Sequence, residues 1–121
     1  MRIRKKFYMD CHLAGRKYHE ADEVWDKLKV GTLMDLERDL DNRHDIDAVA
    51  VIYHNNEDGE FYKIGYLPRE DNETIASILE MGWTNIFECR ISKINPDAHP
   101  ENQVHLTIKI KKNNAEITDI A

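Results

Sequence analysis

The sequence predicts a mostly β fold of the α+β class, a small and strongly bent sheet or partly open barrel of six strands with two short helices. The 121-residue chain is long enough to form one hydrophobic core without disulfides or metal ions to stabilise it. Its 41% hydrophobic and 33% charged residues are typical of a globular domain. Several short runs alternate apolar and polar residues with the period of half-buried strands. Closure around one core removes exposed edges from such strands.

The amino-terminal half supplies a strand, a helix and two more strands. Apolar residues alternate over 7–13, beginning with Phe7, and predict the first strand. Asp22 is placed to cap a short helix that ends before Gly31 and carries Val24, Trp25 and Leu28 on one side. The run 32–38 predicts a second strand. The uninterrupted apolar run 48–53 predicts a central strand covered on both faces.

The next elements follow from turn chemistry. Asp58-Gly59 predicts a hairpin, because glycine adopts positive φ freely. The return strand holds Gly65, which indicates a bulge, a bend or a close backbone approach, and Pro68 ends it. Asp71 or Asn72 is then placed to cap a second helix with Ile75, Ile78 and Leu79 on one face and Gly82 at its end.

Two alternating runs, 87–91 and 104–111, predict the last strands, and a loop with two prolines separates them. We expect residues 1–112 to form one domain and residues 113–121 to form a weakly patterned carboxyl-terminal tail.

Charge limits the classes of function. A formal net charge of −6 argues against a broadly basic nucleic-acid coat protein, because non-specific binding depends on neutralising phosphates. Basic residues concentrate near both ends of the chain, which leaves room for a local cationic groove. Acidic residues crowd the middle of the chain: Asp35, Glu37, Asp39, Asp41, Asp45 and Asp47.

Several classes of site find no support in the sequence. The six histidines and two cysteines lack metal-ligand spacing, and no nucleophile elbow or phosphate loop is present, so we expect no metal, no cofactor and no enzymatic activity. We expect no signal peptide, because the basic residues at the start are not followed by an apolar run, and no run approaches the roughly 18 apolar residues of a membrane span. We expect a cytoplasmic protein without membrane contact, in which Cys11 and Cys89 are reduced core residues.

The polar run R-D-L-D-N-R-H-D-I-D-A at 38–48 stands directly before the buried strand and admits two interpretations. In the first, it is structural: Asp45 and Asp47 bind backbone amides in an Asx-turn, and Arg38 pairs with one of these carboxylates. In the second, the run forms one wall of a binding site. Both roles can hold together.

Three motifs, taken together, resemble the HIRAN domain family. They are L-E-R-D-L-D-N-R-H-D-I-D-A-V-A-V at 36–51, I-G-Y-L-P-R at 64–69 with a helix after it, and A-G-R-K-Y at 14–18. The resemblance spans roughly residues 7–110. It implies a small OB-like β-barrel with two helices. Family members occur within helicase and ubiquitin-ligase proteins and as small standalone bacterial proteins. A eukaryotic member grips the 3′ end of single-stranded DNA.

The resemblance also implies a binding site. Tyr18 would stack on a base and Lys17 would meet a phosphate. Tyr66, where the eukaryotic member has histidine, and Arg69, where a lysine would face phosphate, would complete that side. A role for Tyr66 in barrel packing is an equal alternative.

The central motif would supply the other wall. Asn42 would donate to backbone or base, and Asp45 would accept a hydrogen bond from a terminal 3′-hydroxyl. His44 replaces a tyrosine and offers a smaller stacking face, and Arg43 stands where the family has proline. The surrounding acids suit a hydroxyl end better than a phosphate track.

The function expected is therefore that of a non-enzymatic DNA-binding module. It would recognise single-stranded or branched DNA ends with a 3′-hydroxyl in repair or replication-stress processing, beside a helicase or nuclease partner. The alternative is a protein–protein interaction module of the same fold that does not bind DNA, which the net charge of −6 favours.

Overall fold

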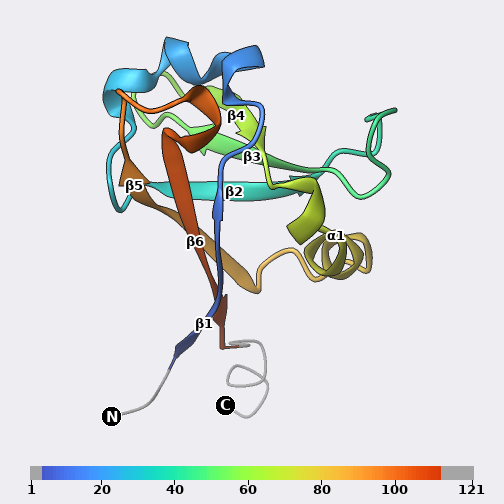
Figure 1. Cartoon of the computed structure of the whole chain (residues 1–121). Coiled ribbons are helices and arrows are strands. Elements are labelled where there is room, and N and C mark those ends of the chain that lie inside the picture. Colours follow the sequence, from blue (N-terminus) through green and yellow to red (C-terminus); the bar gives the residue numbers. More distant parts are fainter. Residues whose placement is uncertain (1–3, 113–121) are drawn as a thin grey trace.

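The structure is a computed structural model that describes residues 4–112, and its centre is one antiparallel six-stranded sheet (Figure 1). The tail predicted over 113–121 lies outside the described residues. The strand order is β1-β6-β5-β2-β3-β4. The mostly β prediction is confirmed. The strands are β1 (Lys5–His12), β2 (Leu33–Arg38), β3 (Val49–His54), β4 (Phe61–Tyr66), β5 (Phe87–Ile94) and β6 (Val104–Lys111).

The sheet bends until its two edge strands meet. β2 pairs with β5 at its start and with β3 along the rest of its length, so it belongs to both halves of the sheet. Just beyond β1, Ala14 forms a bridge with Tyr66 of β4, in which each backbone nitrogen lies 2.8 or 2.9 Å from the other residue's carbonyl oxygen. One bridge joins the edges where a closed barrel would have a full ladder. The result is the predicted partly open barrel.

Gly65 allows this meeting of the edges. A Cβ atom at this position would lie 2.6 Å from the Ala14 carbonyl oxygen and 2.8 Å from Leu13 Cδ1. The β3–β4 register also shifts beside Gly65, between Val51 and Ile52. The sequence-based expectation of a bulge or a close approach is confirmed, and both occur.

The prediction of two α-helices is half wrong. Within the described residues there is one α-helix, α1 (Glu73–Glu80), which packs beside β2 (Figure 1). The segment expected to form the first helix is instead a series of 3-10 turns, η1 (Arg16–Tyr18), η2 (Glu20–Glu23) and η3 (Trp25–Lys27). Val24 interrupts it with φ −128° and ψ 15°, which no α-helix contains. The remaining 3-10 turns are η4 (Arg69–Asp71) and η5 (Pro100–Asn102).

The alternation expected for β1 fails at its start. Phe7 is 63% exposed, whereas Tyr8 and Met9 both pack against the core. A register shift against β6 between Phe7 and Met9 accounts for this, because an extra residue moves the following side chains to the other face. From Cys11 onward the expected inward face holds.

The core lies inside the bent sheet and is dominated by β-branched and leucine side chains, which suit a pleated, buried surface. β3 is buried on both faces, as predicted, and Gly59 adopts φ +73° in the hairpin that follows it. Cys11 and Cys89 are free and buried, and burial raises the pKa of Cys11 to about 12. Among the described residues, no helix has the length and apolar character needed to cross a membrane.

Candidate nucleic-acid interface

A cavity of about 240 Å³ opens where the two sheet edges meet, and we call it the end pocket. Three chain segments form it: the residues just after β1, the polar run before β3, and the end of β4 with the turn after it. Its lining residues are Ala14, Gly15, Asn42, His44, Asp45, Ala48, Tyr66, Leu67 and Arg69.

Five of the seven residues predicted to bind nucleic acid line this pocket: Asn42, His44, Asp45, Tyr66 and Arg69. They come from two motifs that are about twenty residues apart in the sequence. Lys17 and Tyr18 do not line the pocket. They lie in η1, which begins next to the lining residue Gly15. Tyr18 is 77% exposed, and the Lys17 Nζ atom is 5.9 Å from its ring centroid.

Side-chain to backbone hydrogen bonds fix the polar run. Asn42 Oδ1 accepts from the backbone N–H groups of His44 at 2.8 Å and Asp45 at 3.1 Å. Asp45 Oδ1 accepts from the Asp47 N–H at 2.9 Å, which confirms the predicted Asx-turn at Asp45. Because the Asn42 oxygen is held this way, its amide NH₂ is left as the donor that a ligand can meet.

A buried asparagine holds Asp45 from behind. Asn72 is 1% exposed, and its Nδ2 atom donates to Asp45 Oδ2 at 2.7 Å. Sequence reasoning placed Asn72 as a candidate cap of α1. It occupies the N-cap position but makes no side-chain cap hydrogen bond, and its backbone has helical angles, φ −97° and ψ −18°, where capping residues are extended. Each Asp45 oxygen keeps a free lone pair for a further donor.

Tyr66 is anchored by two charged residues. Its hydroxyl donates to Asp39 Oδ2 and accepts from Lys63 Nζ at 3.0 Å, and Lys63 Nζ lies 3.6 Å from Asp39 Oδ2. The Tyr66 hydrogen bond lowers the pKa of Asp39 and raises that of Lys63. Asp39 therefore has a cation beside it and adds less negative potential to the pocket than the sequence suggested.

His19 borders the same group. Its ring meets the Tyr66 ring edge-on, with centroids 5.1 Å apart. Burial and the nearby Lys63 lower the pKa of His19, which favours the neutral form of its imidazole. Sequence reasoning missed Lys63 and His19 as neighbours of the site, since neither stands in a recognisable motif. Asp39 was expected only to add to the negative charge around the site.

The expected pairing of Arg38 with Asp45 or Asp47 is wrong. Arg38 Nη2 binds Glu80 of α1 at 2.8 Å, and Nη1 donates to the Ala48 carbonyl at 3.1 Å. Arg38 still fixes the polar run, because it binds the backbone of Ala48 and links the run to α1. Among residues 4–112, Asp45 forms no ion pair with an arginine.

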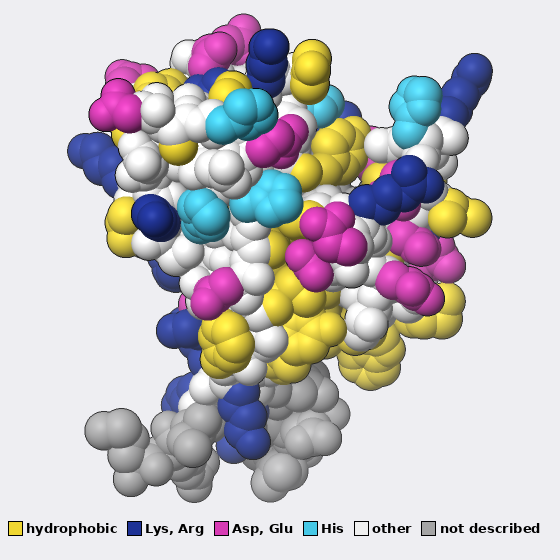
Figure 2. Space-filling model, in the orientation of Figure 1, with side chains coloured by type: hydrophobic (Ala, Val, Ile, Leu, Met, Phe, Trp, Pro, Cys, Tyr) yellow, Lys and Arg dark blue, Asp and Glu magenta, His cyan; other side chains and the backbone are white. Residues whose placement is uncertain are grey.

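The pocket carries few cations. Arg69 is exposed and has no ion-pair partner among the described residues. Figure 2 shows acidic, basic and histidine side chains interspersed over the visible face, without a broad basic area. Within residues 4–112, no group of three or more His, Cys, Asp or Glu side chains is arranged to hold a metal ion.

These features define a small, partly open β-barrel with a polar pocket where its edges meet. The sequence profile of the HIRAN domain matches residues 6–112, and the chain belongs to this family. A Fanconi-associated nuclease 1 homolog from Oryza sativa subsp. japonica is 32% identical over 104 residues, which make up 85% of this chain and 10% of that protein. The chain thus spans one tenth of the length of this relative.

Two solved structures share the fold. A protein from Lactobacillus plantarum matches with a TM-score of 0.72 at 17% identity, over 90% of this chain and 97% of that chain. The HIRAN domain of human HLTF matches with a TM-score of 0.56 at 20% identity, over 94% of this chain and 86% of that chain. The OB-like character of the predicted barrel is confirmed at the level of the fold.

Proposed function

We propose that this chain is a non-enzymatic DNA-binding module that holds the 3′-hydroxyl end of a single strand in the end pocket. The observation that carries the proposal is the convergence of Asn42, His44, Asp45, Tyr66 and Arg69 on one cavity. The HIRAN resemblance independently assigns these five residues to DNA. Their meeting in space supports a common ligand.

The size of the pocket favours an end over a duplex. About 240 Å³ is below the roughly 300–1,000 Å³ of pockets for drug-sized ligands, and it suits one terminal nucleotide. His44 and Tyr66 offer ring faces for a base, and base–aromatic stacking contributes about 1–3 kcal/mol per base. Arg69 is placed to meet the last phosphate.

Asp45 would decide between chemical ends. A carboxylate accepts a hydrogen bond from a hydroxyl group and repels a phosphate. Its position is set by the Asp47 N–H and by Asn72, so its geometry does not depend on the ligand. The pocket should therefore prefer a 3′-hydroxyl to a 3′-phosphate.

The test is fluorescence anisotropy with a labelled single strand that ends in either group. We expect at least a tenfold preference for the hydroxyl, which Asp45→Asn abolishes. Asp41→Asn is the matched control, because Asp41 belongs to the same run but does not line the pocket. With Lys17 and Arg69 each meeting one phosphate, the slope of log K against log salt should be about −1.4. No binding to either end at low salt, or an unchanged preference in Asp45→Asn, would contradict the proposal.

The biological setting proposed is DNA repair or replication-stress processing beside a nuclease or helicase, and it is supported by the name of the rice relative. The alternative is a protein-interaction module, which the formal charge of −6 favours. A pull-down with nuclease treatment separates the two, since a partner bridged by DNA is lost and a direct partner stays.

A further inference from the structure

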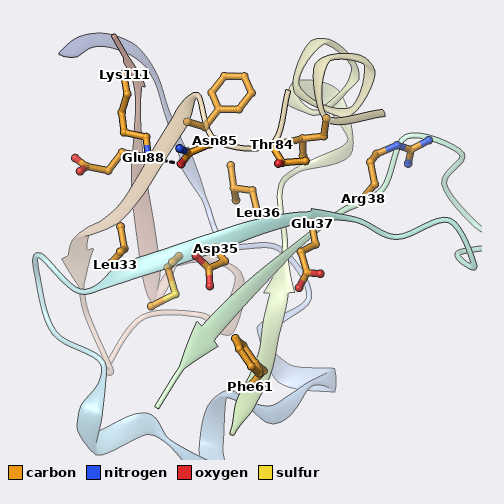
Figure 3. A pocket seen from close by; sticks show the side chains of 13 residues that line it. Leu33, Asp35, Leu36, Glu37, Arg38, Phe61, Thr84, Asn85, Glu88 and Lys111 are labelled. Carbon is orange, nitrogen blue, oxygen red and sulfur yellow. Dashed lines mark hydrogen bonds between the residues drawn. The ribbon is translucent and has the colours of Figure 1, made fainter. Parts of the chain in front are cut away.

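A second cavity of about 620 Å³ runs along β2 and shares no lining residue with the end pocket (Figure 3). We call it the β2 groove. β2 forms one wall, and the segment that enters β5 forms the other. Its lining residues are 33–38 of β2, Phe61, Leu79, Thr84, Asn85, Phe87, Glu88 and Lys111.

The β2 groove exists because the ladder between β2 and β5 stops early. Leu33 pairs with Arg90 and Met34 with Cys89, and no further pair follows. In the same antiparallel register the next hydrogen-bonded pair would be Leu36 with Phe87. Both residues line the β2 groove instead.

The backbone groups of Leu36 face this opening. The N–H of Asp39 donates to the Ala48 carbonyl at 3.0 Å, so in the alternating pattern of the β2–β3 ladder Asp35 and Glu37 bond to β3. The N–H and C=O of Leu36, one residue out of phase, point away from β3 and toward β5.

Phe87 faces the opening from the other side. The Lys111 N–H donates to the Ile86 carbonyl at 2.7 Å, so residues 86 and 88 bond to β6 and Phe87 points toward β2. Within the described residues, two strand edges whose backbone donors and acceptors have no ladder partner therefore line one groove. Such edges are templates for an added strand.

The side chains beside these edges divide by face. Figure 3 shows Leu36 and Glu37 projecting to opposite sides of β2, with Phe61 on the Glu37 side. The Leu36 side carries the apolar groups of Leu79 and Phe87. The other side carries the exposed carboxylates of Asp35 and Glu37.

In the described part of the chain, these two carboxylates lack a paired cation, whereas Arg38 and Glu88 are in ion pairs and Lys111 keeps its charge beside a neutral amide. Among residues 4–112, neither Asp35 nor Glu37 forms an ion pair. Arg38 binds Glu80 at 2.8 Å, and Lys111 donates to Asn85 at 3.0 Å. Glu88 binds Lys5 at 2.6 Å. The β2 groove thus has negative charge available for a cationic ligand.

We propose that the β2 groove binds an extended segment of a partner protein as an added strand along β2. The segment alternates basic and apolar residues, since successive side chains of a strand point to opposite faces. Basic side chains meet Asp35 and Glu37, and apolar side chains fill the space against Leu36, Leu79 and Phe87. This site is independent of the end pocket and of its proposed ligand.

The test uses the full chain and a fluorescein-labelled peptide of seven residues that alternates lysine and valine. We expect it to bind at least tenfold more tightly than the matched glutamate–valine peptide. The double variant Asp35→Lys/Glu37→Lys should weaken lysine–valine binding at least tenfold. Asp26→Lys/Asp97→Lys is the control, because both residues are exposed and each pair of substitutions raises the formal charge by four, from −6 to −2. Equal losses in both variants would show general attraction only and overturn the proposal.

Backbone methylation of the peptide tests strand addition itself. N-methyl groups on one set of alternate residues should abolish binding, and those on the other set should leave the affinity within threefold. Equal effects of the two sets would contradict an added strand. Displacement of the probe by a synthetic peptide of residues 113–121 would make the chain's own tail the occupant and overturn the choice of a partner protein. Asp45→Asn should leave peptide binding unchanged, so this experiment and the DNA experiment fail separately.

Discussion

The end pocket and the β2 groove are two hollows of one barrel with different physical origins. The end pocket lies where the sheet edges are joined, and hydrogen bonds from Asn42, Asp45 and Asn72 hold its polar wall. The β2 groove lies where two strands separate, and two of its carboxylates, Asp35 and Glu37, form no ion pair among residues 4–112. One sheet thus offers a preorganised pocket where its edges join and an unpaired strand edge where its strands separate. Changes at the pocket should therefore cost stability, and changes at the groove should not.

The largest effect is expected at the seam. Gly65→Ala would place a methyl group 2.6 Å from the Ala14 carbonyl oxygen, so the two edges must separate. We expect a loss of about 3 kcal/mol in the free energy of unfolding, measured by urea denaturation. Gly59→Ala is the control, with φ +73° and open space around it, and should cost about 1 kcal/mol. Equal costs would show that the close approach is not what Gly65 provides.

The next effect concerns the support of Asp45. Asn72→Ala removes the Nδ2 donor 2.7 Å from Asp45 Oδ2 and leaves a small void in a buried place. We expect a loss of about 2 kcal/mol, as for a hydrogen bond to a charged group, together with a weaker preference for the 3′-hydroxyl end. The exposed Asn102→Ala should change stability by less than about 0.5 kcal/mol. If Asn72→Ala shows the expected loss of stability but keeps its preference for the 3′-hydroxyl end, Asn72 does not support the function of Asp45 in the pocket.

A smaller effect is expected at the Tyr66 anchor. Tyr66→Phe keeps the ring and removes its hydrogen bonds to Asp39 and Lys63, and should cost about 1 kcal/mol at pH 7. The folded-state pKa of Asp39 is lowered, so its contribution is present above the unfolded pKa of about 3.9 and is lost as pH falls through the folded value. The stability difference between the wild type and Asp39→Asn should accordingly be constant from about pH 5 to 8 and shrink toward pH 2. A difference that grows in acid would contradict this assignment.

The smallest effect is expected at the β2 groove. Asp35→Lys/Glu37→Lys breaks no ion pair among residues 4–112, so the free energy of unfolding should stay within about 0.5 kcal/mol of the wild type. Urea denaturation at low and high salt checks this. A loss of more than about 2 kcal/mol would mean that the two carboxylates help to hold the barrel, which would remove the contrast with the end pocket.

The strands and the hairpin could be predicted because their information is local: alternation in β6, an apolar run in β3 and Asp58-Gly59 between β3 and β4. The helix expected around Val24 and Trp25 could not be distinguished from 3-10 turns, since both bury residues at spacings of three and four. The bulge at Phe7 depends on its register with β6. Asn72 could not be read as a support for Asp45, because its role is set by a residue 27 positions away. The resemblance predicted the polar wall of the end pocket. The hydrogen bonds from Tyr66 to Asp39 and Lys63 could be seen only in the structure.

The most direct test of the central claim is an amide NMR titration of the full chain with a short single-stranded DNA ending in a 3′-hydroxyl. Binding in the end pocket predicts shifts at Gly15, Asn42, His44, Asp45 and Arg69, with residues 33–38 of the β2 groove unchanged. Shifts confined to the β2 groove, or none at low salt, would contradict it.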